Sequence, residues 1–439
     1  MNQKVLIITY YWTPSGGPGV QRWLKFVKYL PDFDIQPVVL TVDPASAEYP
    51  VIDESLSGDV SPDLEVYRTE CKGVYNLYKR LTGTKTAPYS GFANEGNPGL
   101  LQKFSRFIRG NFFLPDARRG WIKYAFAEAC RLIEKFGIET VITTGPPHST
   151  HLTGLKIKKK YNIRWIADFR DPWSNIQYKS FLYQTRWAQK MDMKSERRVL
   201  KHCDRALLAV DERKRLAIVH PHIDIGKMDF MPNGYDESDF EGMTFDPPDD
   251  FVITYTGTIA VNYPAGGLVE ALLQVRERFP FIMQFVGKTD EITRSLFERN
   301  LSANTCFHDH VSHQKSVEFL AKSSILLLIN ANAEGSEFLL HGKIFEYLAS
   351  GKPILLLGAV DGIAANIIKS AKAGAAFDYN DVEGIANFLS EQYQNQLKGI
   401  RPEPDWKIIR QYSRKRLTQQ LSDLLGLSNP AGFERDEEL

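Results

Sequence analysis

Runs of consecutive apolar residues alternate along the chain with stretches in which apolar positions recur at helical spacing. The first run, over residues 4–10, predicts a fully buried strand because Val5, Leu6 and Ile7 follow one another. A glycine-rich loop and a helical pattern over 20–30 come next. Further strand patterns stand at 37–42, 139–144, 163–167 and 205–210. This alternation of strand and helix predicts a parallel α/β sheet.

The pattern restarts after an acidic, proline-containing stretch at 246–250. Strand patterns follow at 251–256, 281–286, 304–308, 324–330 and 353–357. Two α/β units explain this order better than one sheet of about ten strands. We expect a first domain over 1–235, a linker over 236–250, a second domain over 251–403, a helix over 404–427 and a polar, disordered tail over 428–439.

Composition narrows the classes of function. The 54 Lys and Arg nearly balance the 53 Asp and Glu. The resulting net charge of +1 argues against nucleic-acid binding by the charge of the whole surface. The four cysteines are scattered without a Cys-x-x-Cys pair, which argues against structural zinc and disulfides. With no signal peptide and no long apolar run, the sequence predicts a cytoplasmic protein.

Three loops follow predicted strands of the first domain. Gly16 and Gly17 lie in the first, where glycines allow an anion to approach the backbone, although a plain tight turn explains them nearly as well. The spacings typical of dinucleotide-binding and P-loop motifs are absent, so NAD or ATP binding on those fingerprints is unsupported.

The second and third of these loops carry polar side chains. His148 and His151 occupy the second loop, as catalytic groups or as capping or surface residues. The third contains Asp168, Arg170 and Asp171, which form either part of a site or a salt-bridge network that shapes the loop. Because the carboxyl ends of parallel strands share one edge, we expect the three loops to converge there.

A helix opening near Gly342 and ending at Gly351 carries the strongest local signal. Glu346 lies on it among apolar neighbours, where an unpaired carboxylate would be costly. Two vicinal ribose hydroxyls would satisfy this carboxylate, and a buried ion pair is the alternative.

Residues 99–119 mix apolar and basic side chains. Arg106 and Arg109 alternate with Leu, Phe and Ile, and Arg118 and Arg119 follow. Such a segment can lie on an anionic membrane or bind a lipid-linked acceptor. The alternative is a helix packed on the sheet with its cations in water.

Six stretches together resemble retaining glycosyltransferases of the B-type fold, which has two Rossmann-like domains, and in particular the large family four with its bacterial polysaccharide-assembly enzymes. These stretches are residues 11–20, 115–121, 168–173, 231–236, 255–258 and 343–353, and they occur in the family's order. The resemblance implies an acceptor-side domain, a hinge at 232–236, a donor-side domain and a last helix that crosses back to the first domain. It implies transfer of a sugar from a nucleotide-diphosphate donor to a saccharide or lipid-linked saccharide, in cell-surface polysaccharide or glycolipid biosynthesis.

The resemblance also implies roles for individual residues. Asp171 and Arg170 would orient the acceptor or the reacting sugar, with His148 as a further catalytic candidate. The donor nucleotide and its phosphates would contact Gly16, Gly17, Gly257, Thr258 and Glu346. Further donor-binding candidates are Ile344 and, as a source of positive charge, Lys288 and Lys343. No Asp-x-Asp motif or His/Cys cluster stands in the donor half, so we expect no obligate metal and no cofactor, with the nucleotide sugar as a substrate. Retention, domain closure and peripheral contact with the cytoplasmic face of the membrane are further expectations.

Three departures from the family pattern keep other functions open. The first of the family's paired glutamates is replaced by Phe338, with Glu337 one position away, and Thr258 and Pro264 stand where an Arg and a Lys are common. The family's catalytic histidine is replaced by Arg170. The alternatives are a nucleotide-sugar epimerase of the same fold and a catalytically inactive sugar-binding subunit.

Overall fold

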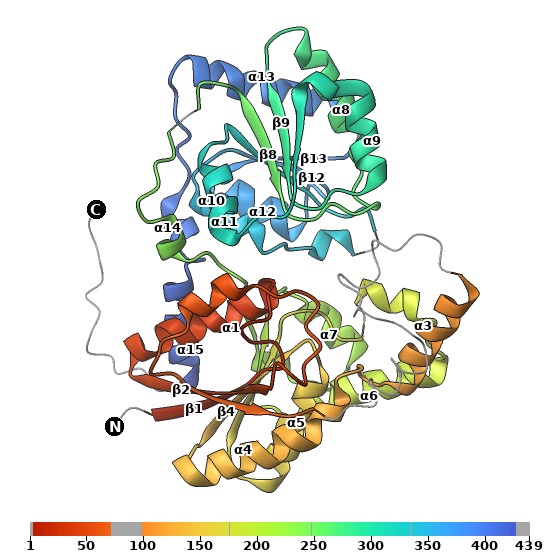
Figure 1. The fold of residues 1–439 in the computed structure, drawn as a ribbon, viewed down its shortest axis with the longest axis vertical. Helices are drawn as coiled ribbons and strands as arrows, with labels where there is room; N and C mark the ends of the chain where they lie inside the picture. The colour runs from red at the N-terminus through yellow and green to blue at the C-terminus, as the bar shows by residue number, and fades with distance from the viewer. Residues whose placement is uncertain (1–2, 72–98, 175, 247, 334, 427–439) are drawn as a thin grey trace. The chain divides into compact units, whose positions relative to one another are not determined.

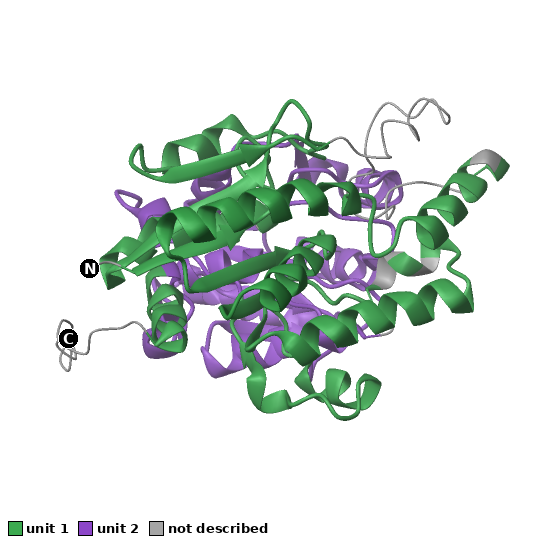
Figure 2. Ribbon diagram, turned by 90° about the horizontal axis from the view of Figure 1, so that it is seen from below, with its two compact units in different colours: residues 1–232, 415–439 green, residues 233–414 purple. Residues whose placement is uncertain are grey.

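The computed structural model describes residues 3–71, 99–174, 176–246, 248–333 and 335–426. The polar tail expected at 428–439 lies outside the described residues. The chain divides into two compact units, coloured separately in Figure 2. Unit 1 comprises residues 1–232 and 415–439, and unit 2 comprises residues 233–414.

Unit 1 is built on a parallel sheet, and its described residues form seven strands in the order β3-β2-β1-β4-β5-β6-β7 (Figure 1). The strands are β1 (Gln3–Ile8), β2 (Ile35–Val42), β3 (Glu65–Thr69), β4 (Thr140–Gly145), β5 (Arg164–Phe169), β6 (Arg205–Leu208) and β7 (Met228–Phe230). The helices are α1 (Pro18–Tyr29), α3 (Leu100–Phe112), α4 (Ile122–Phe136), α5 (Ser149–Lys160), α6 (Arg186–His202), α7 (Arg213–Val219) and α15 (Arg414–Leu425). Short 3-10 helices are η1 (Leu30–Phe33), η2 (Glu54–Asp59), η4 (Arg119–Trp121), η5 (Gln177–Leu182) and η6 (Ile225–Lys227).

Unit 2 has a second parallel sheet, in which the described residues form six strands in the order β10-β9-β8-β11-β12-β13. The strands are β8 (Val252–Thr256), β9 (Ile282–Val286), β10 (Thr305–His308), β11 (Ile325–Ile329), β12 (Ile354–Leu357) and β13 (Gly374–Phe377). The helices are α8 (Gly266–Arg276), α9 (Glu291–Leu301), α10 (His313–Ala321), α11 (Lys343–Ala349), α12 (Ile363–Ser370), α13 (Val382–Leu397) and α14 (Trp406–Arg410). Short 3-10 helices are η7 (Glu237–Phe240), η8 (Ser302–Asn304) and η9 (Ser336–Phe338).

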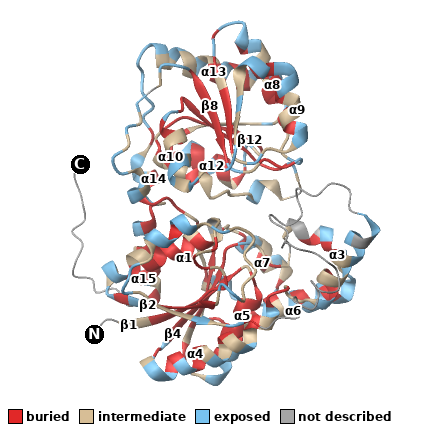
Figure 3. Cartoon of the chain, in the orientation of Figure 1, coloured by how far each residue is buried: buried red, intermediate tan, exposed pale blue. Residues whose placement is uncertain are grey.

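The two sheets confirm the α/β architecture with two Rossmann-like domains. The central strands are buried on both faces (Figure 3), which explains their uninterrupted apolar sequences. The sequence patterns did not predict β3, β7 or β13, which are all edge strands. Edge strands are less covered, so polar or small residues are tolerated there, as in the sequence EVYRT of β3.

The C-terminal segment is divided between the units. Helix α14 belongs to unit 2, where Ile409 packs in the core. Helix α15 belongs to unit 1 from Lys415 onward, and its Leu417, Leu421 and Leu425 pack in the same core cluster as β1 and α1. Arg164 of β5 secures the end of α15 by donating to the carbonyls of residues 424 and 425.

Candidate functional site

In unit 2, the loops after β8 and β9 lie close together at the carboxyl edge of the sheet. The Gly257 N–H donates to the Val286 carbonyl at 2.7 Å, and Ile259 N–H donates to the Lys288 carbonyl at 2.9 Å. Gly257 has a φ of +98°, which favours glycine. A Cβ at Gly287 would lie 2.4 Å from the Gly257 carbonyl oxygen, so the two loops leave no room for a side chain there.

The side chain of Lys343 reaches this pair of loops from α11. Its Nζ lies 3.7 Å from the centroid of the Tyr255 ring and donates to the Thr256 carbonyl. A Cβ at Gly257 would be only 3.2 Å from the same Nζ. Burial lowers the pKa of Lys343 to about 7, and Glu346 acts in the opposite direction. The Nζ of Lys343 therefore lies against the loop after β8.

Glu346 lies one turn further along α11 and faces a histidine. Its Oε1 is 3.8 Å from Nδ1 of His313, and Nε2 of His313 is 3.0 Å from Oδ2 of Asp239. Burial raises the pKa of Glu346, and His313 partly opposes this shift. At 3.8 Å the contact with His313 is too long for a hydrogen bond, so the carboxylate keeps capacity to accept bonds from a ligand.

Sequence patterns missed His313 and Asp239. Both are on other elements, α10 and η7, and only the fold brings them to Glu346. The helix start at Ser312, whose hydroxyl accepts from the Lys315 N–H, is a recognisable cap, and His313 follows it directly. That signal places His313 at a helix N-terminus but does not identify its partner.

The structure gives four more of the predicted donor residues defined places. Ile344 is fully buried in the core of unit 2, and its N–H donates to the His341 carbonyl, so it belongs to the packing of α11. The Gly257 N–H is used by the sheet, so it is not a phosphate donor. Lys288 is exposed on the loop after β9, and Thr258 accepts a bond from the Tyr255 hydroxyl through its carbonyl at 2.8 Å.

At the carboxyl edge of the unit 1 sheet, Asp168 is fully buried and held by three side chains. Arg22 Nη2 lies 2.8 Å from Asp168 Oδ1, and Trp23 Nε1 and Thr144 Oγ1 donate to Oδ2 at 2.6 and 2.8 Å. Arg22 also donates to the carbonyls of Met231 and Pro232, both at 2.8 Å. Despite burial, which acts to raise it, the pKa of Asp168 is lowered by Arg22 and these hydrogen bonds. Asp168 therefore joins α1, β4, β5 and residues 231–232, and its ionic partner is Arg22 instead of the neighbouring Arg170 that the sequence suggested.

The guanidinium of Arg170 packs against the glycine-rich loop. Arg170 is buried, and it donates to the carbonyls of Gly145 and Pro146. A Cβ at Gly19 would lie 1.9 Å from Nη1 of Arg170. Nη1 itself has no hydrogen-bond partner among the described residues. The structure thus brings the three loops together at Arg170, whose guanidinium lies against the first turn of α1.

The remaining predicted residues of the first two loops have defined places. Gly16 N–H donates to the Val51 carbonyl at 3.0 Å, and Gly17 is the N-cap of α1. His148 is buried and stacks on Trp173 at a centroid distance of 4.9 Å. Burial lowers the pKa of His148 well below its usual value, which favours the neutral form of its ring. His151 is fully buried, and its Nδ1 is 2.9 Å from Thr143 Oγ1.

The acceptor-side candidates divide into buried and exposed groups. Asp171 is exposed just beyond β5. Arg106 and Arg118 are buried, at 4% and 8% exposure, so they do not form a surface that a membrane could contact. Arg109 is half-buried and Arg119 is exposed.

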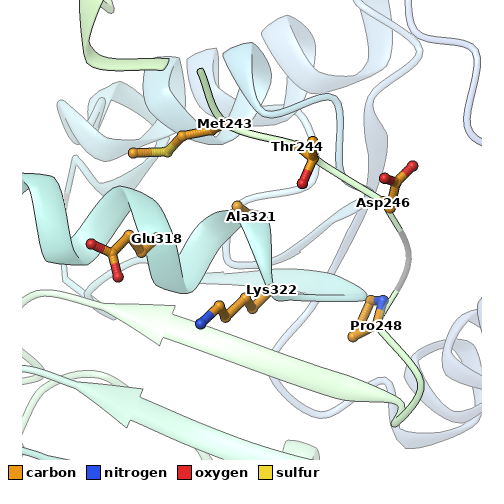
Figure 4. Close-up of a pocket in the computed structure, with 7 residues that line it drawn as sticks. All are labelled: Met243, Thr244, Asp246, Pro248, Glu318, Ala321 and Lys322. Atoms are coloured by element: carbon orange, nitrogen blue, oxygen red, sulfur yellow. The ribbon is translucent and has the colours of Figure 1, made fainter. Parts of the chain in front are cut away.

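A pocket of about 280 Å³ lies elsewhere in unit 2, beside the segment that carries Asp246 (Figure 4). Glu318 and Lys322, at the far end of α10 from His313, line it. None of the predicted donor residues lines this pocket. It lies at the opposite edge of the sheet, since α10 ends just before β11 begins.

In the described part of the chain, no group of three or more His, Cys, Asp or Glu side chains is arranged to hold a metal ion. No helix in that part has both the length and the apolarity needed to cross a membrane.

Comparison with known proteins supports the fold. No family model matches the sequence, and no curated protein is significantly similar to it. A glycosyltransferase from Rickettsia africae is 14% identical, with a TM-score of 0.59 over 96% of this chain and 97% of that chain. Anabaena HepE, solved with UDP-glucose, is 11% identical, with a TM-score of 0.60 over 96% of this chain and 99% of that chain.

A protein of Listeria monocytogenes assigned as a UDP-N-acetylglucosamine 2-epimerase also shares the architecture. It is 12% identical, with a TM-score of 0.55 over 99% of this chain and 100% of that chain. Identities this low establish the fold and leave the reaction to be argued from the site. The chain has the fold of the B-type glycosyltransferases, with two Rossmann-like domains.

Proposed function

We propose that the protein is a glycosyltransferase that moves a sugar from a nucleotide-diphosphate donor to a saccharide or lipid-linked saccharide acceptor. The observation that carries the proposal is the arrangement on α11. Lys343 projects over the loop after β8, and Glu346, one turn later, keeps acceptor capacity beside His313. A cation for the phosphates and a carboxylate for the ribose hydroxyls fit two adjacent parts of a nucleoside diphosphate.

The proposed reaction breaks the bond between the sugar's anomeric carbon and the donor phosphate oxygen. The acceptor hydroxyl forms the new bond to that carbon, and its proton passes to the departing phosphate oxygen. Attack from the side of the leaving group gives retention of configuration. Lys343 stabilises the negative charge that develops on the diphosphate, and Asp171 with Arg170 orients the acceptor or the reacting sugar. No step in this scheme requires a metal. We further propose that the product belongs to cell-surface polysaccharide or glycolipid biosynthesis.

We expect acceptor-dependent release of nucleoside diphosphate from one nucleotide sugar, and we expect it to persist in EDTA. The assay incubates the protein with UDP-, GDP- and ADP-sugars, with and without a saccharide mixture, and measures released diphosphate. Turnover of the donor without acceptor would support an epimerase, and binding without turnover would support an inactive sugar-binding subunit. Loss of all release in EDTA, restored by Mg²⁺, would contradict the metal-free scheme.

Replacing Lys343 by Met should weaken UDP binding by about tenfold to a hundredfold while leaving uridine binding unchanged, because a charge-assisted bond is worth about 1.5–3 kcal/mol. Since the pKa of Lys343 is lowered to about 7, the wild-type affinity for UDP should also fall as pH rises above that value. Calorimetric titration at several pH values measures both effects.

Lys398→Met is the matched control, because Lys398 is an exposed lysine of the same unit. Equal losses for UDP and uridine in Lys343→Met would contradict a phosphate role. So would a wild-type affinity that does not change with pH.

A further inference from the structure

Helices α3 and α6 and the 3-10 helix η5 form one connected part of unit 1. Asn111 near the end of α3 joins them: its Nδ2 donates to the Tyr183 carbonyl at 3.1 Å, and its Oδ1 accepts from the N–H and hydroxyl of Thr185 at 2.7 Å. Gln184 Nε2 donates to the Gly110 carbonyl at 3.1 Å. These bonds hold α3 against η5 and the start of α6, and Figure 1 shows α3 and α6 as neighbours.

Large apolar side chains are concentrated on this part of the surface. Of the 19 large hydrophobic residues that are exposed within the described chain, nine lie in residues 100–112 and 181–193. Phe104 and Trp187 are 62% and 63% exposed, and Leu100 is 85% exposed. Leu100, Phe104 and Phe107 fall at helical spacing on one side of α3. An apolar concentration of this kind marks a contact surface.

The exposed charges on the same two helices all have one sign. Helix α3 contains no acidic residue. The two acidic residues of α6, Asp192 and Glu196, are buried; Asp192 pairs with Lys179 and accepts from Trp173 Nε1 at 2.6 Å, and Glu196 Oε2 is 3.0 Å from His220 Nε2. The exposed charged side chains of α6 are basic: Arg186, Lys190, Lys194, Arg197, Arg198 and Lys201. A chain with a net charge of only +1 thus presents a strongly positive, aromatic surface here.

We propose that this α3–α6 surface docks the protein on an anionic lipid bilayer. Aromatic and aliphatic side chains enter the interface while Lys and Arg meet lipid phosphates. The exposed charges of both helices are all positive, which complements the phosphates of an anionic bilayer and favours a lipid surface as the partner. This surface keeps α3 from the segment 99–119 that the sequence suggested, but α6 supplies most of its charge, and Arg106 and Arg118 are buried.

Flotation with vesicles tests the proposal. The protein should float with vesicles of phosphatidylglycerol and phosphatidylcholine, less so with phosphatidylcholine alone, and less so as NaCl is raised. Phe104→Ser combined with Trp187→Ser should abolish flotation. Lys190→Glu combined with Lys194→Glu should weaken the partition coefficient by at least about fivefold for each cation lost.

Ile292→Ser combined with Lys398→Glu is the matched control in unit 2, since Ile292 is 62% exposed. It should float like the wild type, and all variants should keep UDP binding, which makes failure of docking distinct from failure of the donor site. Absence of flotation with anionic vesicles overturns the proposal. So does equal loss in the control, or a dimer in analytical ultracentrifugation that Phe104→Ser abolishes.

Discussion

Arg22→Met should lower the free energy of unfolding by about 3–5 kcal/mol, because it leaves the buried carboxylate of Asp168 without its cation. The methionine keeps most of the side-chain volume, so the loss reports the charge and the hydrogen bonds. Arg22 and Asp168 both have fully buried side chains, joined at 2.8 Å. Urea unfolding followed by circular dichroism gives the value.

The same helix offers a control. Lys28 is 3.8 Å from Asp59 with 28% of its side chain exposed, so Lys28→Met should cost less than about 1 kcal/mol. Adding Asp168→Asn to Arg22→Met should recover part of the loss, since no unpaired charge then remains. A cost for Arg22→Met no larger than that for Lys28→Met would show that the buried pair does not anchor unit 1.

Glu346→Gln should weaken UDP binding by about tenfold to a hundredfold, because a charged acceptor for ribose hydroxyls contributes about 1.5–3 kcal/mol. The loss should be much smaller with 2′-deoxy-UDP, which lacks one of the two hydroxyls. Calorimetry with both ligands on both proteins forms a double-mutant cycle, and its coupling energy isolates the contact.

The control for this cycle is Glu318→Gln. Glu318 lies on α10, the helix of His313, and pairs with Lys315 at the surface. The Glu318→Gln variant should bind both nucleotides like the wild type. If the losses of binding free energy from Glu346→Gln and from removal of the 2′-hydroxyl are additive, Glu346 does not bind the ribose. The carboxylate would then serve its ion pair with His313.

The sequence predicted those strands and helices that are determined by residues close together in the chain. Val5 to Ile8 are consecutive and apolar because β1 lies between two strands and is buried on both faces. The bounds of α11 follow from Gly342 and Gly351 at its ends. Strand β13, with the sequence GAAF, was not predicted, because an edge strand of small residues has no distinctive hydrophobic pattern.

The parts that were not predicted depend on contacts between residues far apart in the chain. Nothing near Asp168 indicates that Arg22 neutralises it, and nothing near Glu346 indicates His313. Asp192 and Glu196 of α6 are buried because they pair with side chains far away in the sequence or on other elements, and no pattern on α6 indicates this. Whether a charged residue forms a site, an anchor or a surface is therefore settled by the fold.

The return of the chain to unit 1 at α15 has a consequence for synthesis on the ribosome. Unit 2 is inserted into unit 1, and its two ends are paired where Arg414 N–H donates to the Tyr235 carbonyl at 2.7 Å. The apolar cluster around Val5, Ile7 and Trp23 also contains Leu417, Leu421 and Leu425 of α15. The domain that is translated first therefore completes its core last, after the inserted domain has left the exit tunnel, and until then the surface that α15 will cover is left for chaperones to shield.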